Sequence, residues 1–142
     1  MEIVLNTLED IEKFAYKFAS LLKGNELVAL SGSLGAGKTT FTKYVGHALK
    51  IKEEIISPTF NIIKIYDSCK GPFYHVDAYR LENLGYDPVL DDYIFDDNAI
   101  KFIEWYNFLD EEIFDNAIKI HITELDNNRR LFKVEGLDIC ID

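Results

Sequence analysis

The stretch Gly32-Ser33-Leu34-Gly35-Ala36-Gly37-Lys38-Thr39 decides the fold, because it matches the pattern G-x-x-x-x-G-K-[ST]. In this pattern the glycines let the backbone turn so that successive N–H groups point inward at an anion. The following helix presents its positive N-terminal end to the same anion. Lys38 would bridge the β- and γ-phosphates of a nucleotide, and the Thr39 hydroxyl would face Mg²⁺. The stretch therefore predicts a phosphate-binding loop (P-loop), with Thr40 as a further donor.

The residues on either side of the loop supply the strand and the helix that this motif requires. The apolar run from Glu26 to Leu30 predicts a short buried strand. A helix is predicted from Lys38 to Leu49, because its apolar residues recur at helical spacing (Phe41, Tyr44, Val45, Ala48 and Leu49). This context disfavours the alternative of a glycine-rich turn that binds nothing.

Further from the loop, helical and strand-like patterns alternate along the chain. Residues 2–5 predict a strand, and a capping box at Thr7–Asp10 begins a helix that ends before Gly24, its expected C-cap. Phe60 to Tyr66 and Phe73 to Val76 predict an antiparallel hairpin, and further strands are expected at 99–104, 118–122 and 131–135. We therefore expect one P-loop domain over residues 1–142. Its α/β fold is a mixed sheet, parallel in part, flanked by helices and carrying antiparallel hairpins.

A P-loop also needs a carboxylate to hold Mg²⁺ and a group to orient the attacking water. Three apolar runs end in an acid, at Asp67, Asp77 and Glu104, and spacing alone does not choose among them. Acids at strand ends are also common turn formers. Thr59, in a proline-marked loop, is a candidate contact for the γ-phosphate, with a simple turn hydroxyl as the alternative.

The composition narrows the class of ligand. The net charge is −10 and the pI is about 4.7, which disfavours direct binding of the chain to nucleic acid. The chain lacks the Asn-Lys-x-Asp motif by which GTPases read guanine. Its three arginines (Arg80, Arg129 and Arg130) leave few candidates for the arginine-rich lid of a small kinase. ATP is therefore the nucleotide favoured by elimination.

Composition also bears on location and on metal centres other than Mg²⁺. The start of the chain lacks the basic and long apolar regions of a signal peptide, and no apolar run is long enough to span a membrane. The two cysteines, Cys69 and Cys140, form no C-x-x-C pair, which disfavours a zinc site or a disulfide framework. We expect a cytoplasmic protein.

Four blocks in this order make the chain resemble the bacterial TsaE family of tRNA threonylcarbamoyladenosine biosynthesis ATPases. They are the P-loop, Ser57-Pro58-Thr59-Phe60, His75-Val76-Asp77-Ala78-Tyr79-Arg80-Leu81 and Ile103-Glu104-Trp105. The resemblance covers roughly residues 5–136 and implies a small ATPase that acts with the TsaB–TsaD complex. On this view the chain contacts tRNA only indirectly and does not itself perform the transfer to adenosine 37.

The resemblance also implies roles for single residues. The P-loop residues contact the phosphates, Thr39 and Glu104 form the Mg²⁺ shell, and Asp77 is a switch carboxylate near the metal and the attacking water. Thr59 becomes a second switch contact, and Trp105 lies beside the nucleotide or acts in a conformational step, with a core aromatic as the alternative. Two other functions stay open at this point: a small P-loop kinase, and a nucleotide-gated binding module without turnover.

Overall fold

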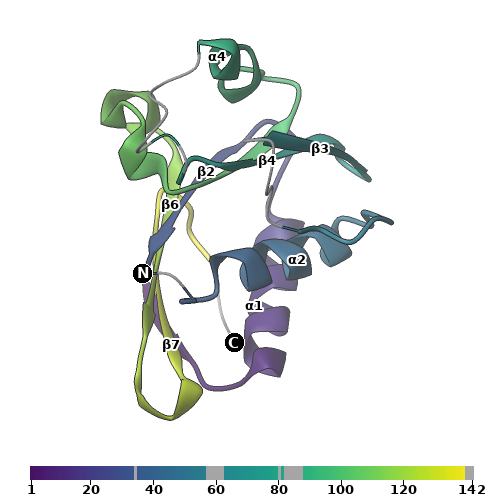
Figure 1. The fold of residues 1–142 in the computed structure, drawn as a ribbon. Coiled ribbons are helices and arrows are strands. Elements are labelled where there is room, and N and C mark those ends of the chain that lie inside the picture. The colour runs from purple at the N-terminus through teal and green to yellow at the C-terminus, as the bar shows by residue number, and fades with distance from the viewer. Residues whose placement is uncertain (34, 57–62, 80, 82–87, 140–142) are drawn as a thin grey trace.

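The computed structural model describes residues 1–33, 35–56, 63–79, 81 and 88–139 (Figure 1). Its centre is a seven-stranded sheet in the order β1-β7-β6-β2-β5-β4-β3. The strands are β1 (Glu2–Leu5), β2 (Leu27–Gly32), β3 (Ile63–Ser68), β4 (Gly71–Asp77), β5 (Ile100–Glu104), β6 (Ile118–Glu124) and β7 (Arg130–Glu135). Strands β6, β2, β5 and β4 are parallel, whereas β3, β7 and β1 run antiparallel to their neighbours. The expected mixed α/β sheet with antiparallel hairpins is confirmed.

Helices cover the sheet on both faces. Helices α1 (Leu8–Ser20) and α2 (Lys38–Ala48) lie together on one side, and the short helix α4 (Val89–Ile94) lies beyond the other (Figure 1). Three 3₁₀ turns complete the described elements: η1 (Tyr106–Phe108), η2 (Glu111–Phe114) and η3 (Asp126–Asn128). The sequence patterns had not indicated α4. It has only two buried residues, Leu90 and Ile94, and no side-chain cap, so its local signal is weak.

Two apolar cores follow from the alternation of side chains along the strands. On the face covered by α1 and α2, five phenylalanine rings pack edge to face or tilted against one another: Phe14, Phe18, Phe41, Phe102 and Phe132. On the opposite face Ala29, Val76 and Ile103 pack with the buried side of α4 and with Phe114. Because both faces are buried, the central strands are apolar runs, as parallel strands usually are.

The end of α1 differs from expectation. Thr7 caps its start, accepting a hydrogen bond from the Asp10 N–H at 3.1 Å, as predicted. The predicted C-cap at Gly24 is wrong, because the helix ends at Ser20 with Leu21 as its cap. The Lys70 ammonium accounts for this end by donating to the Ala19 and Ser20 carbonyls at 3.0 and 3.3 Å. Gly24 instead allows close approach of Lys70, whose carbonyl would lie 2.8 Å from an added Cβ.

The strand order brings the chemistry-bearing ends together. Strand β2 lies between β5 and β6, and β4 lies on the far side of β5. In register, Leu30 is opposite Glu104, and Glu104 is opposite Asp77. The loop after β2 and the acids that end β4 and β5 therefore share one edge, where ligands usually bind in open α/β sheets. In the described part of the chain, no helix has the length and apolar character needed to cross a membrane.

Candidate functional site

Two glycines of the loop are required by its geometry. Gly32 has φ 145°, and a Cβ there would lie 2.5 Å from the Ile122 carbonyl oxygen of the neighbouring strand β6. Gly37 has φ 114°, a left-handed conformation that an L side chain rarely adopts, and it immediately precedes α2. Its carbonyl accepts from the Phe41 N–H at 2.9 Å, so the first turn of the helix closes directly on the loop.

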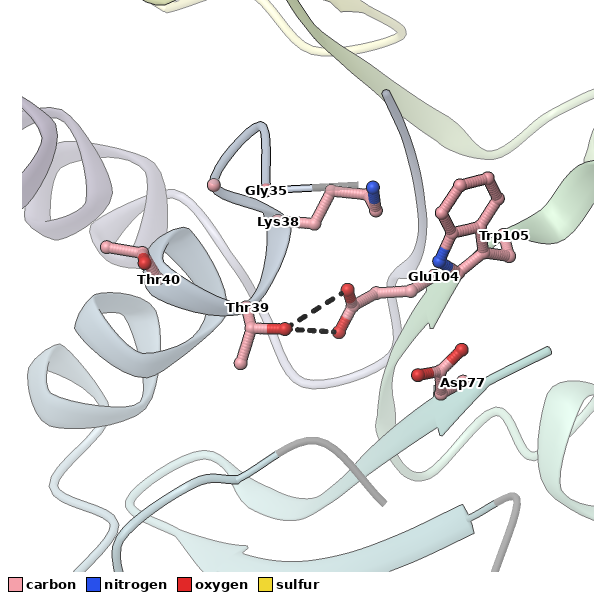
Figure 2. Close-up of a pocket in the computed structure, with 8 residues that line it drawn as sticks. Gly35, Lys38, Thr39, Thr40, Asp77, Glu104 and Trp105 are labelled. Carbon is pink, nitrogen blue, oxygen red and sulfur yellow. Dashed lines mark hydrogen bonds between the residues drawn. The ribbon is translucent and has the colours of Figure 1, made fainter. Parts of the chain in front are cut away.

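A cavity of about 210 Å³ opens beside this loop (Figure 2). It is lined by loop and helix residues, by both strand-end acids and by one aromatic side chain: Gly35, Gly37, Lys38, Thr39, Thr40, Asp77, Glu104 and Trp105. Of the three candidate acids, Asp77 and Glu104 line the cavity, whereas Asp67 lies in the edge strand β3 opposite Pro72. The candidates Leu34, Thr59 and Arg80 lie outside the described residues.

The Lys38 side chain folds back onto the P-loop and is held by two of its carbonyls. Its side chain is 5% exposed, and its Nζ donates to the Gly32 and Ser33 carbonyls at 2.7 and 2.9 Å. Nζ also lies 4.3 Å from the centroid of the Trp105 ring, within the range of a cation–π contact. Burial lowers the pKa of the ammonium, and the nearby carboxylates of Glu104 and Asp77 partly oppose this effect.

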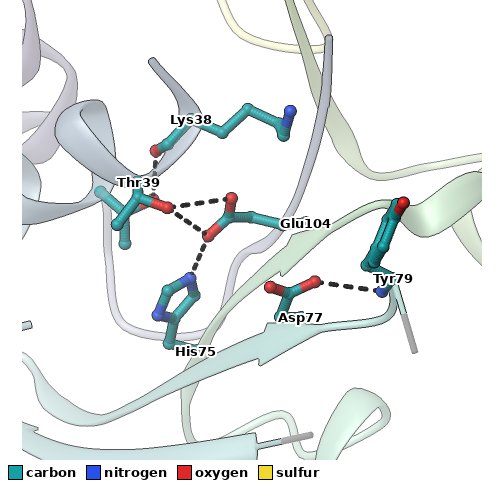
Figure 3. Close-up of polar contacts among 7 residues, drawn as sticks. Lys38, Thr39, His75, Asp77, Tyr79 and Glu104 are labelled. Atoms are coloured by element: carbon teal, nitrogen blue, oxygen red, sulfur yellow. Dashed lines mark hydrogen bonds and ion pairs between the residues drawn. The ribbon is translucent and has the colours of Figure 1, made fainter. Parts of the chain in front are cut away.

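Glu104 is held from two sides (Figure 3). The residue is 2% exposed, and the Thr39 hydroxyl lies 3.3 Å from each oxygen of its carboxylate. On the other side it pairs with Nε2 of His75, which is fully buried; His75 Nδ1 has no hydrogen-bond partner in the described part of the structure. Hydroxyl and carboxylate oxygens side by side are the hard donors that Mg²⁺ prefers, together with phosphate and water. Thr39 and Glu104 therefore fit a magnesium site.

Asp77 and Trp105 complete the far wall of the cavity. The Asp77 carboxylate accepts from the Tyr79 N–H at 3.0 Å, which fixes its direction at the end of β4 (Figure 3). Trp105 has φ 60° and ψ 40°, a left-handed conformation that is costly for a bulky residue. This conformation turns its ring out of the strand, 4.9 Å from the Tyr79 ring. Trp105 thus lines the cavity while also packing, half-buried, against the second core.

Sequence reasoning missed the contact between Arg130 and the loop. The guanidinium Nε of Arg130, at the start of β7, donates to the Ala36 carbonyl at 2.9 Å. No local signal could have found this contact, because the two residues are 94 positions apart and meet only when β7 joins the sheet.

The fold and this cavity together define a nucleotide-binding protein of the P-loop class, with two carboxylates at the strand ends beside the loop. The chain matches the family model described as "Threonylcarbamoyl adenosine biosynthesis protein TsaE" over residues 5–132, and it belongs to the TsaE family. The family takes part in the threonylcarbamoyladenosine modification of tRNA, and membership implies that the chain binds a nucleotide. The resemblance in the sequence blocks is thereby confirmed.

Individual relatives agree over nearly the whole chain. The TsaE protein of Aquifex aeolicus is 36% identical over 135 residues, covering 94% of each chain. The TsaE protein of Bacillus subtilis is 36% identical over 122 residues, covering 86% of this chain and 77% of its own. The crystal structure of YdiB from Bacillus subtilis superposes with a TM-score of 0.75 at 29% identity, covering 93% of this chain and 82% of that one.

Proposed function

We propose that the chain is a Mg²⁺-dependent ATPase that binds ATP at residues 32–40 and acts in tRNA modification together with the TsaB–TsaD complex. The observation that carries this proposal is the convergence of Lys38, Thr39, Asp77 and Glu104 on one cavity beside a P-loop. These residues come from α2, β4 and β5, and the sheet order alone brings them together. The proposal extends to the whole chain as one domain.

The loop and Lys38 would carry the phosphates. In P-loops the N–H groups of the loop and the N-terminal end of the following helix form a cradle for a polyanion, and residues 32–40 with α2 would act in this way. Lys38 now donates to two carbonyls of its own loop, at 2.7 and 2.9 Å. Phosphate oxygens would replace those carbonyls, because an ammonium binds an anionic oxygen more strongly than a neutral carbonyl oxygen. Trp105, beside Lys38, would contact the bound nucleotide, and Thr40 would add a donor.

Of the two acids, Glu104 would bind the metal and Asp77 would orient water. Thr39 and Glu104 would hold Mg²⁺, which supplies charge neutralisation at the β- and γ-phosphates. Asp77, whose direction is fixed by the Tyr79 N–H, would orient the attacking water or a water on the metal. His75 holds the Glu104 carboxylate from behind. Thr59 would add a contact to the γ-phosphate.

Turnover is expected to be slow in the isolated chain and faster with its partners. Both arginines that the structure describes bind backbone carbonyls of the chain: Arg130 Nε donates to Ala36 at 2.9 Å, and Arg129 Nε donates to Asp126 at 3.2 Å. The charge that develops on the transferring phosphoryl group therefore lacks a described arginine in the same chain, and a partner can supply it.

The test is phosphate release from ATP by the full chain with and without TsaB–TsaD, at varied Mg²⁺, with Lys38→Ala as control. Release that rises with the partner complex, requires Mg²⁺ and vanishes in Lys38→Ala supports the proposal. Fast turnover without partners contradicts the coupling, and a phosphorylated acceptor identifies a kinase instead. Binding without release in any mixture leaves a nucleotide-gated binding module.

A further inference from the structure

The side chain of Arg130 reaches the outer side of the P-loop. Its backbone lies at the start of β7, opposite Leu5 of β1 and Glu124 of β6, so two strand pairings fix its position. The side chain is 17% exposed, and its Nε lies 2.9 Å from the Ala36 carbonyl oxygen. The same Nε lies 4.0 Å from the place where a Cβ on Gly37 would stand, so the guanidinium covers the Ala36–Gly37 peptide.

The direction of this peptide matters for an anion in the loop. The described chain has no cis peptide bond, and in a trans peptide the carbonyl and the following N–H point in opposite directions. Because Arg130 holds the Ala36 carbonyl outward, the Gly37 N–H faces away from Arg130. Gly37 lines the cavity together with Lys38 and Thr39.

We propose that Arg130 is a positioning residue: it holds the Ala36–Gly37 peptide so that the Gly37 N–H is presented to a phosphate of the bound nucleotide. It acts through the loop and does not itself touch the ligand. This inference rests on the proposed nucleotide site and adds a residue from the opposite end of the chain to it.

The loop needs such support because of its composition. Gly37 has φ 114°, and glycine leaves this conformation easily, so the peptide before it can flip unless its carbonyl is held. The hydrogen bond from a guanidinium is charge-assisted and is therefore among the stronger ones in proteins. The remaining contacts of Arg130 are weaker or local: Nη1 to the Arg129 carbonyl at 3.2 Å and Nη2 to Glu124 at 3.7 Å.

Two substitutions separate positioning from charge. Glutamine carries an N–H donor at the same number of bonds from Cα as the arginine Nε, but without the charge. Lysine keeps the charge, but places a methylene where Nε stood. If the hydrogen bond positions the loop, Arg130→Gln retains nucleotide affinity near the wild-type value, whereas Arg130→Lys and Arg130→Ala each weaken it roughly tenfold or more.

The neighbouring arginine supplies a matched control. The Nε of Arg129 donates to the Asp126 carbonyl at 3.2 Å, within its own turn. Arg129→Ala therefore removes the same charge close by, and its nucleotide affinity should equal that of the wild type. Thermal unfolding of each variant shows that the chain is folded when its affinity is measured.

The experiment is a titration of the full chain with ADP and with a non-hydrolysable ATP analogue plus Mg²⁺, read by calorimetry and by the fluorescence of Trp105, the one tryptophan of the chain. Rescue by glutamine and not by lysine is the expected result. Rescue by lysine and not by glutamine overturns the proposal, because Arg130 would then act through its charge. Wild-type affinity in every folded Arg130 variant also overturns it. A wild-type chain that binds neither nucleotide instead refutes the proposed function itself.

Discussion

Two lysines are buried at opposite ends of the parallel strands, and their surroundings are closely alike. Lys38 follows β2 and is 5% exposed, whereas Lys101 stands at the start of β5 and is 3% exposed. Each ammonium donates to two backbone carbonyls, Lys101 to those of Asn25 and Asp96 at 3.0 and 2.6 Å. Burial lowers the pKa of both, against the opposing effect of nearby acids. Neither burial nor a lowered pKa therefore distinguishes Lys38, which we propose binds phosphate, from Lys101, whose contacts are structural.

The size of the neighbouring cavity does not identify the ligand-binding lysine either, because the larger cavity lies beside Lys101. The cavity at Lys38 measures about 210 Å³, and the one that Lys101 borders measures about 700 Å³. What differs is the origin of the carbonyls. Lys101 ties the segment before β2 to the one before β5, whereas Lys38 binds its own glycine loop and can exchange those carbonyls for another acceptor. The carboxyl edge of the strands, where Lys38 lies, is also where α/β sheets bind ligands.

The largest effect should come from replacing each lysine by methionine. Lys38→Met is expected to lower phosphate release in the partner complex by about 10²–10³-fold, because a preorganised charge at the phosphates is lost. Lys101→Met should leave release near the wild-type rate. Steady-state phosphate release measures both variants, and equal losses would remove the distinction between the two ends.

The acids near each lysine give the next contrast. Glu104→Gln keeps the side-chain shape but removes the charge that would hold Mg²⁺. It should raise the Mg²⁺ concentration for half-maximal phosphate release at least about tenfold. The matched variant is Glu26→Gln at the other end, where the carboxylate accepts from three backbone N–H groups of residues 23–25. An altered Mg²⁺ requirement in Glu26→Gln, or none in Glu104→Gln, would contradict the assignment.

The free energy of unfolding should rank the two lysine variants in the opposite order to phosphate release. Lys101→Met leaves the carbonyls of Asn25 and Asp96 without their donor, so the free energy of unfolding should fall by about 2 kcal/mol. Lys38→Met should cost less, because both carbonyls that Lys38 receives belong to the loop just before it, whereas Lys101 joins two segments that are far apart in the sequence. Urea denaturation of both variants decides the order, and a larger loss in Lys38→Met would reverse the comparison.

The smallest effect on the free energy of unfolding should come from Tyr74, which holds the residue that binds Lys101. The side chain of Asp96, whose carbonyl receives Lys101, accepts a hydrogen bond from the Tyr74 hydroxyl at 2.7 Å. This bond, with burial, raises the pKa of Tyr74 from 10.0 to about 12, and it lowers the pKa of Asp96. Tyr74→Phe should therefore destabilise the fold, but less than Lys101→Met.

The loss in Tyr74→Phe should depend on pH in a defined way. A raised tyrosine pKa stabilises the fold fully below pH 10.0, and this contribution is lost as the pH rises through about 12. A lowered aspartate pKa stabilises above pH 3.8, and its contribution is lost in acid. The gap between wild type and Tyr74→Phe should thus be widest between these values. A gap that is constant from acid to alkaline pH would show that packing, and not the hydrogen bond, is responsible.

Local patterns in the sequence predicted much of the fold. The P-loop, the helix after it and the strands at 118–122 and 131–135 depend on periodicity and on glycine chemistry within a short window, and the structure has each of them. The choice among Asp67, Asp77 and Glu104 is different, because it depends on which strands lie beside β2. No short stretch of the sequence shows which strands lie beside β2 in the sheet.

The missed features share the same cause. The Lys70 ammonium binds the carbonyls at the end of α1 and lies 48–51 residues away in the sequence, so the local pattern that predicted a cap at Gly24 could not show it. Helix α4 is six residues long and is defined by contacts with the second core. Arg130 acts on a carbonyl 94 residues earlier. The sequence thus predicts elements that depend on neighbouring residues. It does not predict features that depend on contacts with a segment far away in the sequence.

The position of β2 in the sheet affects when the P-loop can be assembled during synthesis of the chain. Both neighbours of β2 are made long after it: β5 begins at Ile100 and β6 at Ile118. On the ribosome the phosphate loop therefore emerges beside an unpaired strand, and Arg130 is made only 94 residues after Ala36, the residue whose carbonyl it holds. Because non-local pairings form late, a chain made only as far as α2 would have the P-loop residues without the strands that hold them, and the proposed binding of nucleotide would wait until the β6–β7 hairpin closes.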